Sequence, residues 1–202
     1  MQKILLLFIF LLTASATLTA QTFRGGLAAG IVGSQVDGDT YSGYNKAGVT
    51  AGVWAELAIT DNSSFRLALN YIQKGSRHNP DTILSDIHSY VIRLSYVEMP
   101  LLYHYRMKNK FYAEAGPSLG LLLTHQEKLD YAIVDGIPFR LFDIGIQLGV
   151  GYRFNDALQV GIRAGNSLVS IRNGAGEGYR KRFGTNFGQY NNVMAIELSY
   201  TL

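Results

Sequence analysis

The chain has 202 residues, and its 18 lysine and arginine residues nearly balance 15 aspartate and glutamate residues, so the formal net charge is only +3. A charge this small argues against nucleic acid as a partner. The chain contains no cysteine, which excludes both disulfides and a lipid anchor attached through cysteine, and its length suits one domain.

The first twenty residues have the organisation of a secretory signal peptide. A basic start is followed by a short apolar run and then by small residues. The apolar run is shorter than the ~20 residues that a membrane helix needs. Cleavage after Ala16 or after Ala20 fits the small-residue rule, and we prefer Ala20 because the β pattern starts at Phe23. We therefore expect residues 1–20 to be a signal peptide and 21–202 to be the folded domain.

Alternation of apolar and polar residues predicts eight strands in chain order. Their approximate bounds are 23–34, 46–60, 64–74, 88–106, 110–124, 139–154, 157–163 and 190–202. The clearest alternation runs from Phe142 to Phe154, thirteen residues, whereas an ordinary soluble strand has ~5–6. A tilted strand of ~9–11 residues crosses a bilayer. The sequence therefore predicts an all-β fold, an eight-stranded antiparallel up-and-down transmembrane β-barrel.

The connections between these strands alternate in length. Those at 61–63, 107–109 and 155–156 are short, and those at 35–45, 75–87, 125–138 and 173–189 are long. Bacterial outer-membrane barrels have short periplasmic turns and long outer loops. We therefore expect both termini in the periplasm. Aromatic residues that collect on the outer face beside the short turns support this orientation: Phe23, Phe65, Tyr103, Tyr105, Phe111, Tyr152, Phe154 and Tyr200.

The fourth strand contains two conflicting alternations. Ile92, Leu94 and Tyr96 set one outward phase, whereas Met99 and the apolar residues after it set the other. A β-bulge near Val97 would reconcile the two phases.

Several motifs in order resemble the PorT-like outer-membrane β-barrel family of Bacteroidetes. They are Gly30 with Ser34-Gln35, Gly38-Asp39, Lys46-Ala-Gly48 with Gly52, Val97-Glu98-Met99-Pro100-Leu101-Leu102, Ala115-Gly116-Pro117-Ser118-Leu119-Gly120, and Asp143-Ile-Gly145 through Gly149-Val-Gly151-Tyr152. The resemblance covers essentially the whole mature chain and implies an outer-membrane barrel without enzymatic activity. One member of that family is linked to protein secretion, and this role does not extend to every relative. Leu202 departs from the terminal aromatic residue common in such barrels.

Charged residues on the inward phase of the strands form the main candidate site. Since eight strands leave an interior just wide enough for side chains, we expect these charges to fill the lumen as ion pairs rather than to line an ion path. Arg163 and Glu197 should pair, because they lie at similar height on sequential strands. The predicted network is Arg24, Glu56, Arg66, Arg93, Glu98, Arg106, Glu114, Asp143, Arg153, Arg163 and Glu197.

Two alternative functions are also compatible with an exported protein of eight strands. His88, His104 and His125 could belong to a lipid-A-modifying barrel enzyme, although catalysis needs a nucleophile and a base within hydrogen-bond reach. A secreted lipocalin-like binder would also have eight strands, with its apolar face turned inward. Neither a cofactor nor a metal site is expected, because no His, Asp and Glu cluster has ligand spacing.

The expected partners follow from the predicted location in the outer membrane of a Gram-negative bacterium. They are outer-membrane lipid and lipopolysaccharide, the barrel-assembly machinery during insertion, and a secretion-system or surface protein. Arg180, Lys181 and Arg182 in the last long connection could contact lipopolysaccharide phosphates, or could belong to a plain solvated loop.

Overall fold

The computed structural model describes residues 23–80, 87–134, 136–174, 178–182 and 187–202. The predicted signal peptide and both candidate cleavage sites lie outside the described residues. Eight long strands dominate the fold: β1 (Phe23–Asp37), β2 (Lys46–Ala58), β3 (Ser63–His78), β4 (Tyr90–Arg106), β5 (Phe111–Leu129), β7 (Phe142–Arg153), β8 (Leu158–Ser167) and β10 (Gly188–Thr201). The short elements are η1 (Lys108–Lys110), β6 (Ala132–Ile133) and β9 (Arg172–Asn173).

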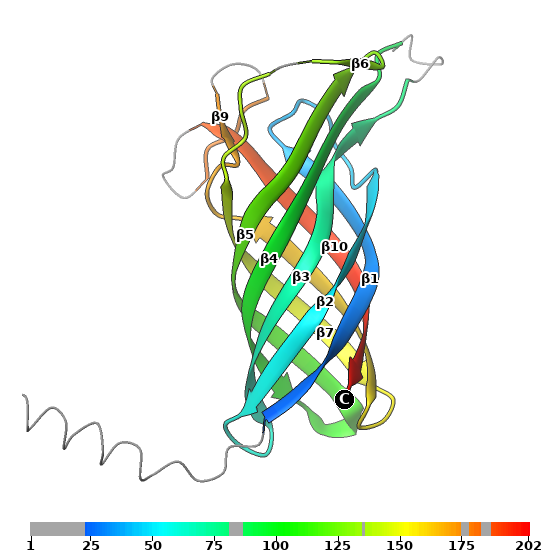
Figure 1. Ribbon diagram of the computed structural model, residues 1–202, viewed down its shortest axis with the longest axis vertical. Coiled ribbons are helices and arrows are strands. Elements are labelled where there is room, and N and C mark those ends of the chain that lie inside the picture. The colour runs from blue at the N-terminus through cyan, green and yellow to red at the C-terminus, as the bar shows by residue number, and fades with distance from the viewer. Residues whose placement is uncertain (1–22, 81–86, 135, 175–177, 183–186) are drawn as a thin grey trace, which may run out of the picture.

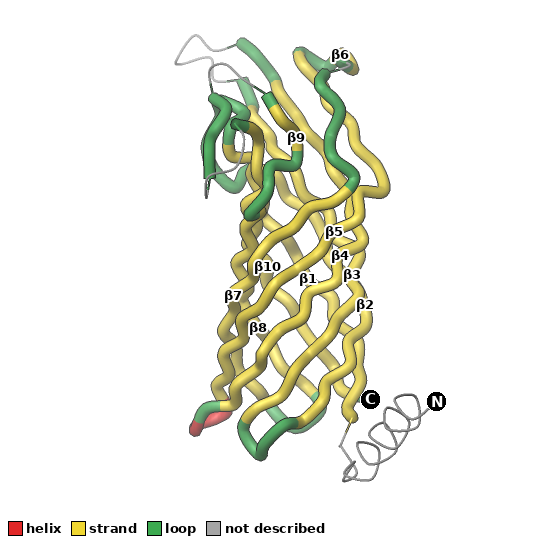
Figure 2. Tube along the Cα trace, turned by 90° about the vertical axis from the view of Figure 1, so that its left-hand side faces the viewer, coloured by secondary structure: helices red, strands yellow, loops and turns green. Residues whose placement is uncertain are grey.

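The eight long strands form one closed antiparallel ring. Each strand pairs with the next along the chain, and β10 returns to pair with β1 over the register Gly26–Thr201 to Asp37–Tyr190. The two-residue strands β6 and β9 extend β5 and β10 outside the ring. This architecture confirms the predicted up-and-down barrel (Figures 1 and 2). We call the end with the C-terminus and the short turns the turn end, and the opposite end the loop end.

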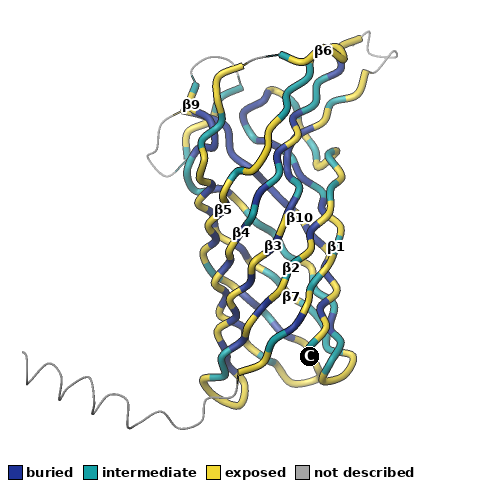
Figure 3. The backbone as a smooth tube through the Cα atoms, in the orientation of Figure 1, coloured by how far each residue is buried: buried dark blue, intermediate teal, exposed yellow. Residues whose placement is uncertain are grey.

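Apolar side chains point away from the barrel axis. The outer face of β7 exposes Ile144, Ile146, Leu148 and Val150, each at least 40% accessible, while Asp143 and Gln147 on the alternate phase are buried. The same alternation of buried and exposed residues runs along much of β3, β4 and the second half of β10 (Figure 3). An apolar outer face matches hydrocarbon rather than water, so the lipocalin alternative is wrong.

The outward aromatic residues gather at the turn end, as predicted. Tyr152 packs edge-on against both Phe111 and Phe154, with ring centroids 5.2 and 5.4 Å apart. Phe65 and Tyr103 form a third edge-on pair at 5.7 Å. Such a row suits the boundary between hydrocarbon and headgroups, where one side of each ring is wet.

The fourth strand differs from the prediction. β4 keeps one alternation from Ile92 to His104, so Ile92, Leu94 and Tyr96 face the lumen, and the predicted bulge near Val97 is wrong. The irregularity lies in the partner strand instead, where β5 has one extra residue opposite Ser95 and Tyr96. The outward assignment of Ile92, Leu94 and Tyr96 failed because an apolar segment that faces the lumen has the same composition as one that faces lipid.

Three neighbouring strands are unusually long, and two of them, β3 and β5, continue past their predicted ends. β3, β4 and β5 have 16, 17 and 19 residues, well beyond the ~9–11 that cross a bilayer. They rise above the other strands at the loop end (Figure 1). The long connections are correspondingly shifted, to 38–45, 79–89, 130–141 and 168–187. No helix among the described residues is long and apolar enough to span a membrane.

Candidate functional site in the barrel lumen

The lumen is filled by three successive layers of side chains. The apolar layer lies on the loop-end side of the other two and includes fully buried residues from β4. Ile171, in the connection that follows β8, closes this layer although it belongs to no long strand. The layer comprises Val32, Val36, Ile72, Ile92, Leu94, Tyr96, Ile171, Val193 and Ala195.

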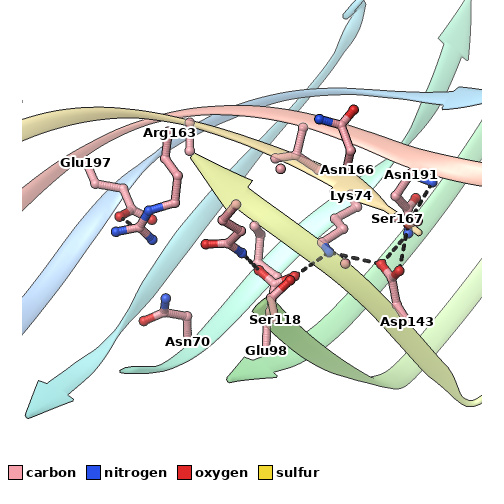
Figure 4. Close-up of a pocket in the computed structure, with 16 residues that line it drawn as sticks. Asn70, Lys74, Glu98, Ser118, Asp143, Arg163, Asn166, Ser167, Asn191 and Glu197 are labelled. Carbon is pink, nitrogen blue, oxygen red and sulfur yellow. Dashed lines mark hydrogen bonds and ion pairs between the residues drawn. The ribbon is translucent and has the colours of Figure 1, made fainter. Parts of the chain in front are cut away.

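The middle layer is centred on Lys74. Its Nζ lies 2.6 Å from Glu98 Oε1 and 3.1 Å from Asp143 Oδ2, and all three side chains are at most 5% exposed. Ser167 and Asn191 donate to Asp143 at 2.6 and 2.9 Å, and Figure 4 shows these groups converging from different strands. One ammonium thus pairs with two carboxylates, from β4 and β7.

A second charge group in the same layer surrounds Arg163. Its Nε donates to Glu114 Oε1 at 2.8 Å, and its Nη1 lies 3.0 Å from Glu197 Oε2. The predicted Arg163–Glu197 pair therefore forms, and β5 supplies a further carboxylate. Lys74 and Arg163 are each a single cation between two buried carboxylates.

The layer at the turn end is centred on Glu56. Arg66 donates two hydrogen bonds to Glu56 Oε2, at 2.6 and 3.0 Å, while Arg106 and Ser64 donate to Oε1 at 2.9 and 2.8 Å. The Arg66 guanidinium also lies 4.3 Å from the centre of the Trp54 ring. Because Arg66 donates to one oxygen of Glu56 and Arg106 to the other, the carboxylate holds the charges of β2, β3 and β4 together.

Three predicted network residues have other positions. The prediction that Arg93 faces the lumen is wrong, because the unbroken alternation of β4 places its side chain on the outer face, where it is exposed. Arg24 and Arg153 lie at the turn-end mouth of the lumen, beside Glu56 and Arg66, and form no ion pair with any described residue. The other eight predicted charges lie in the lumen or at its turn-end mouth.

Sequence reasoning missed two important lumen cations. Lys74 was taken as the end of the third strand, and only the longer β3 brings it inside. Arg172, from β9, reaches Glu127 of β5 at 2.5 Å and stacks 3.9 Å from the centre of the Phe139 ring. The inward phase of Lys74 was visible in the alternation, whereas nothing in the sequence signalled the return of β9 to the barrel.

The basic run at 180–182 is divided by the structure. Arg182 lies 2.7 Å from Asp37 and 4.8 Å from the centre of the Tyr190 ring, so it holds the last connection against β1 and β10. Arg180 is 3.8 Å from Asp37 and, like Lys181, is exposed. Only two of the three residues therefore remain open to a ligand from outside.

The histidines do not gather into one site. His104 is buried in the lumen near the turn end, with its ring 4.5 Å from that of Tyr112. His88 and His125 belong to the loop end, where they contact Asp130 and Phe139. Within the described ranges, no group of three or more His, Asp or Glu residues is arranged to hold a metal ion.

The three layers leave very little free space in the lumen. The pocket around Lys74, Glu98 and Arg163 has a volume of about 20 Å³, and the one beside Glu56 at the turn end also has about 20 Å³. A volume of this size holds about one water molecule. Among the described side chains, the lumen resembles a packed polar core rather than a passage.

Comparisons with known proteins agree with this geometry. Neisserial surface protein A is 13% identical, with a TM-score of 0.51, and the match covers 91% of this chain and 100% of that structure. Ail of Yersinia pestis is 8% identical (TM-score 0.48; 89% and 98% covered), and OprG of Pseudomonas aeruginosa is 14% identical (TM-score 0.41; 89% and 94% covered). No curated protein matches this chain. The family model for the outer membrane protein beta-barrel domain matches residues 19–173, and the chain therefore belongs to this family of the Gram-negative outer membrane.

Proposed function

We propose that this protein is a sealed, non-enzymatic outer-membrane barrel that acts through its outer surface and loops. The observation that carries the proposal is the filled lumen. Two cations, each paired with two carboxylates, fill its middle, and an apolar layer and the Arg172–Glu127 pair fill it toward the loop end. A solute would have to displace buried ion pairs, which is costly when a partner is left without its counter-charge.

The filled lumen supports a role in surface interaction or secretion assistance rather than transport. The loop end carries the long connections, which lie outside the barrel wall. Ile133, Ile137 and Tyr131 there are 51–80% exposed, and contact with another surface protein would cover them.

We also propose that the loop end faces the cell exterior and that both termini are periplasmic. The aromatic row at the turn end and the long connections at the opposite end support this orientation. Residues 1–20 would then act as the signal peptide that directs export, and the barrel-assembly machinery would insert the mature chain.

A narrower proposal is membership of the PorT-like group. The segments that resemble it supply much of the middle layer, since Glu98 and Asp143 hold Lys74 from two of these motifs. A pull-down of this protein from intact outer membranes that also recovers a secretion-system protein would support this assignment. Absence of any such partner, in cells where secretion is active, would argue against it.

Electrical measurements test the sealed lumen directly. In planar bilayers, the purified protein should show no steady conductance, whereas a variant with Lys74→Ser, Tyr96→Ser and Glu98→Ser should pass small currents. Folding of both is checked by the mobility difference between heated and unheated samples. A steady conductance from the unmodified protein would overturn the proposal.

A second measurement tests the non-enzymatic part of the proposal. Lipid A from cells with and without the gene should have the same mass, and a gene-dependent mass change would favour a lipid-A-modifying enzyme.

A further inference from the structure

The extended strands β3, β4 and β5 carry a polar surface on their outer face. Beyond the mostly apolar row Tyr71–Val97–Leu121, the successive outward rows toward the loop end are Gln73–Ser95–Thr124, Gly75–Arg93–Gln126 and Arg77–Val91–Lys128. The row before Tyr71–Val97–Leu121, which is Leu69–Met99–Leu119, is apolar. The face therefore changes from lipid-like to polar within about two residues, or roughly 7 Å along a strand.

Four cations gather just beyond this boundary: Lys46, Arg77, Arg93 and Lys128, which we call the outer basic cluster. They line a groove of about 780 Å³ together with Gln73, Ser95, Thr124 and Gln126. Because all four cations line this one groove, they are placed to share a ligand bound in it.

The outer basic cluster has no acidic partner among the described residues. The Lys46 ammonium donates to the Ala47 carbonyl at 2.7 Å, and Arg77 donates to Asn79 at 2.9 Å. Glu127 lies between Gln126 and Lys128 in the sequence but turns inward to Arg172. Four like charges on one groove repel one another, and an anion bound between them would relieve that repulsion.

The height of the cluster limits what that anion can be. The hydrocarbon core ends where the outer face becomes polar, and headgroups occupy the next several ångströms. Acyl chains can lie on Met99 and Leu121, while the phosphates of the same lipid reach Arg93, which is two rows above Leu121 and three rows above Met99. Arginine and lysine side chains bind phosphate oxygens well.

We propose that the outer basic cluster binds the phosphate groups of a phosphorylated glycolipid in the outer leaflet. The inference rests on the proposed orientation, with the loop end outside. It assigns the lipid contact to the barrel wall, on strands β2 to β5, rather than to the basic run at 180–182. The lipid would lie alongside the groove with its acyl chains on the apolar rows and its phosphates between the four cations.

Retention of diphosphorylated lipid A by the purified protein tests the proposal. In detergent micelles, the protein should retain this lipid through gel filtration, as measured by mass spectrometry. Replacing all four cations by glutamine should reduce retention roughly tenfold, since several exposed ion pairs are lost together. The matched control, Lys108→Gln with Lys110→Gln, removes two cations at the turn end and should retain as much lipid as the unmodified protein.

Further variants and ligands in the same retention assay identify the chemical group that is bound. Arg77→Lys with Arg93→Lys keeps the charge and should stay within about twofold of the unmodified protein. Lipid A without phosphates should not be retained, and inorganic phosphate at millimolar concentration should not displace the intact lipid. Equal retention by the four-glutamine variant, or displacement by free phosphate, would overturn the proposal.

The orientation is tested separately from the binding. Because the chain has no cysteine, single cysteines at Ile137 and Asp61 report the loop end and the turn end. A membrane-impermeant thiol reagent should label Ile137→Cys, and not Asp61→Cys, in intact cells. Labelling of Asp61→Cys alone would overturn the orientation, and with it the outer-leaflet ligand, even if the purified protein retained lipid A.

Discussion

Lys74 and Asp143 meet across the lumen at 3.1 Å, although their strands β3 and β7 are separated in the ring by β4 and β5. The contact spans the barrel interior and is independent of the strand ladder. Since Glu98 shares the same ammonium, one lysine holds three strands to a common point.

Lys74→Met should therefore lower the free energy of unfolding by about 3–5 kcal/mol, because two buried carboxylates lose their counter-charge. Urea unfolding in lipid vesicles measures this change. Adding Glu98→Gln and Asp143→Asn to Lys74→Met should recover much of the loss. The exposed Lys108→Met is the control and should be nearly neutral. A similar small effect for Lys74→Met would mean that water screens the middle layer.

The group around Arg163 predicts an asymmetry between its partners. Glu197→Gln leaves Arg163 paired with Glu114, so the loss should be about 1 kcal/mol. Arg163→Gln leaves both carboxylates alone and should cost about 3–5 kcal/mol. The double variant should lose less than the sum of the two, as measured by the same unfolding assay. Equal losses for the two single variants would contradict the shared-cation geometry.

The barrel and most of its lumen charges could be predicted from period-two alternation. On β7 the apolar and polar sets separate cleanly, because one face meets lipid and the other meets charge. On β4 the separation fails, since Ile92, Leu94 and Tyr96 form an apolar layer inside the barrel. Alternation reports which residues share a face, but not which face is the interior.

Contacts made by the connections were beyond the reach of the sequence. Ile171 and Arg172 enter the lumen because the chain after β8 turns back and β9 pairs with β10. Arg182 is held by Asp37, which is 145 residues away in the chain. No local pattern encodes such long-range pairs, so the exposed basic run predicted at 180–182 was only partly right.

Trp54, the single tryptophan of the chain, should report packing at the turn end. Its ring is buried between β1 and the Arg66 guanidinium. A Cβ on Gly26 would lie 2.4 Å from this ring and 2.1 Å from the Tyr200 carbonyl oxygen of β10. Gly26→Val should displace the ring, shift its emission to longer wavelength and cost about 1–3 kcal/mol through overpacking. Gly25→Val is the control, because the nearest atom to its Cβ is 3.6 Å away. Unchanged emission from Gly26→Val would contradict this packing.

Asp39, in the connection between β1 and β2, predicts a pH dependence at the loop end. Burial raises the pKa of its carboxyl to about 6, and the nearby charge of Asp37 acts in the same direction, while the Tyr41 amide opposes them by donating to Asp39 Oδ1 at 3.0 Å. Between about pH 4 and pH 6, the Asp39 carboxyl is therefore protonated in the folded connection and ionised in the unfolded one. Its stability is greatest below about pH 4 and falls as the pH rises to about 6, by at most about 3 kcal/mol.

Hydrogen exchange of residues 38–45, corrected for the intrinsic effect of pH, measures this local stability. Protection in the unmodified protein should decrease between pH 4 and pH 6 and then level off. Asp39→Asn cannot ionise and should keep its protection across the range, whereas Asp61→Asn, in an exposed turn, should behave like the unmodified protein. If Asp39→Asn lost protection over the same interval, another group would control this connection, with Asp37 as the nearest candidate.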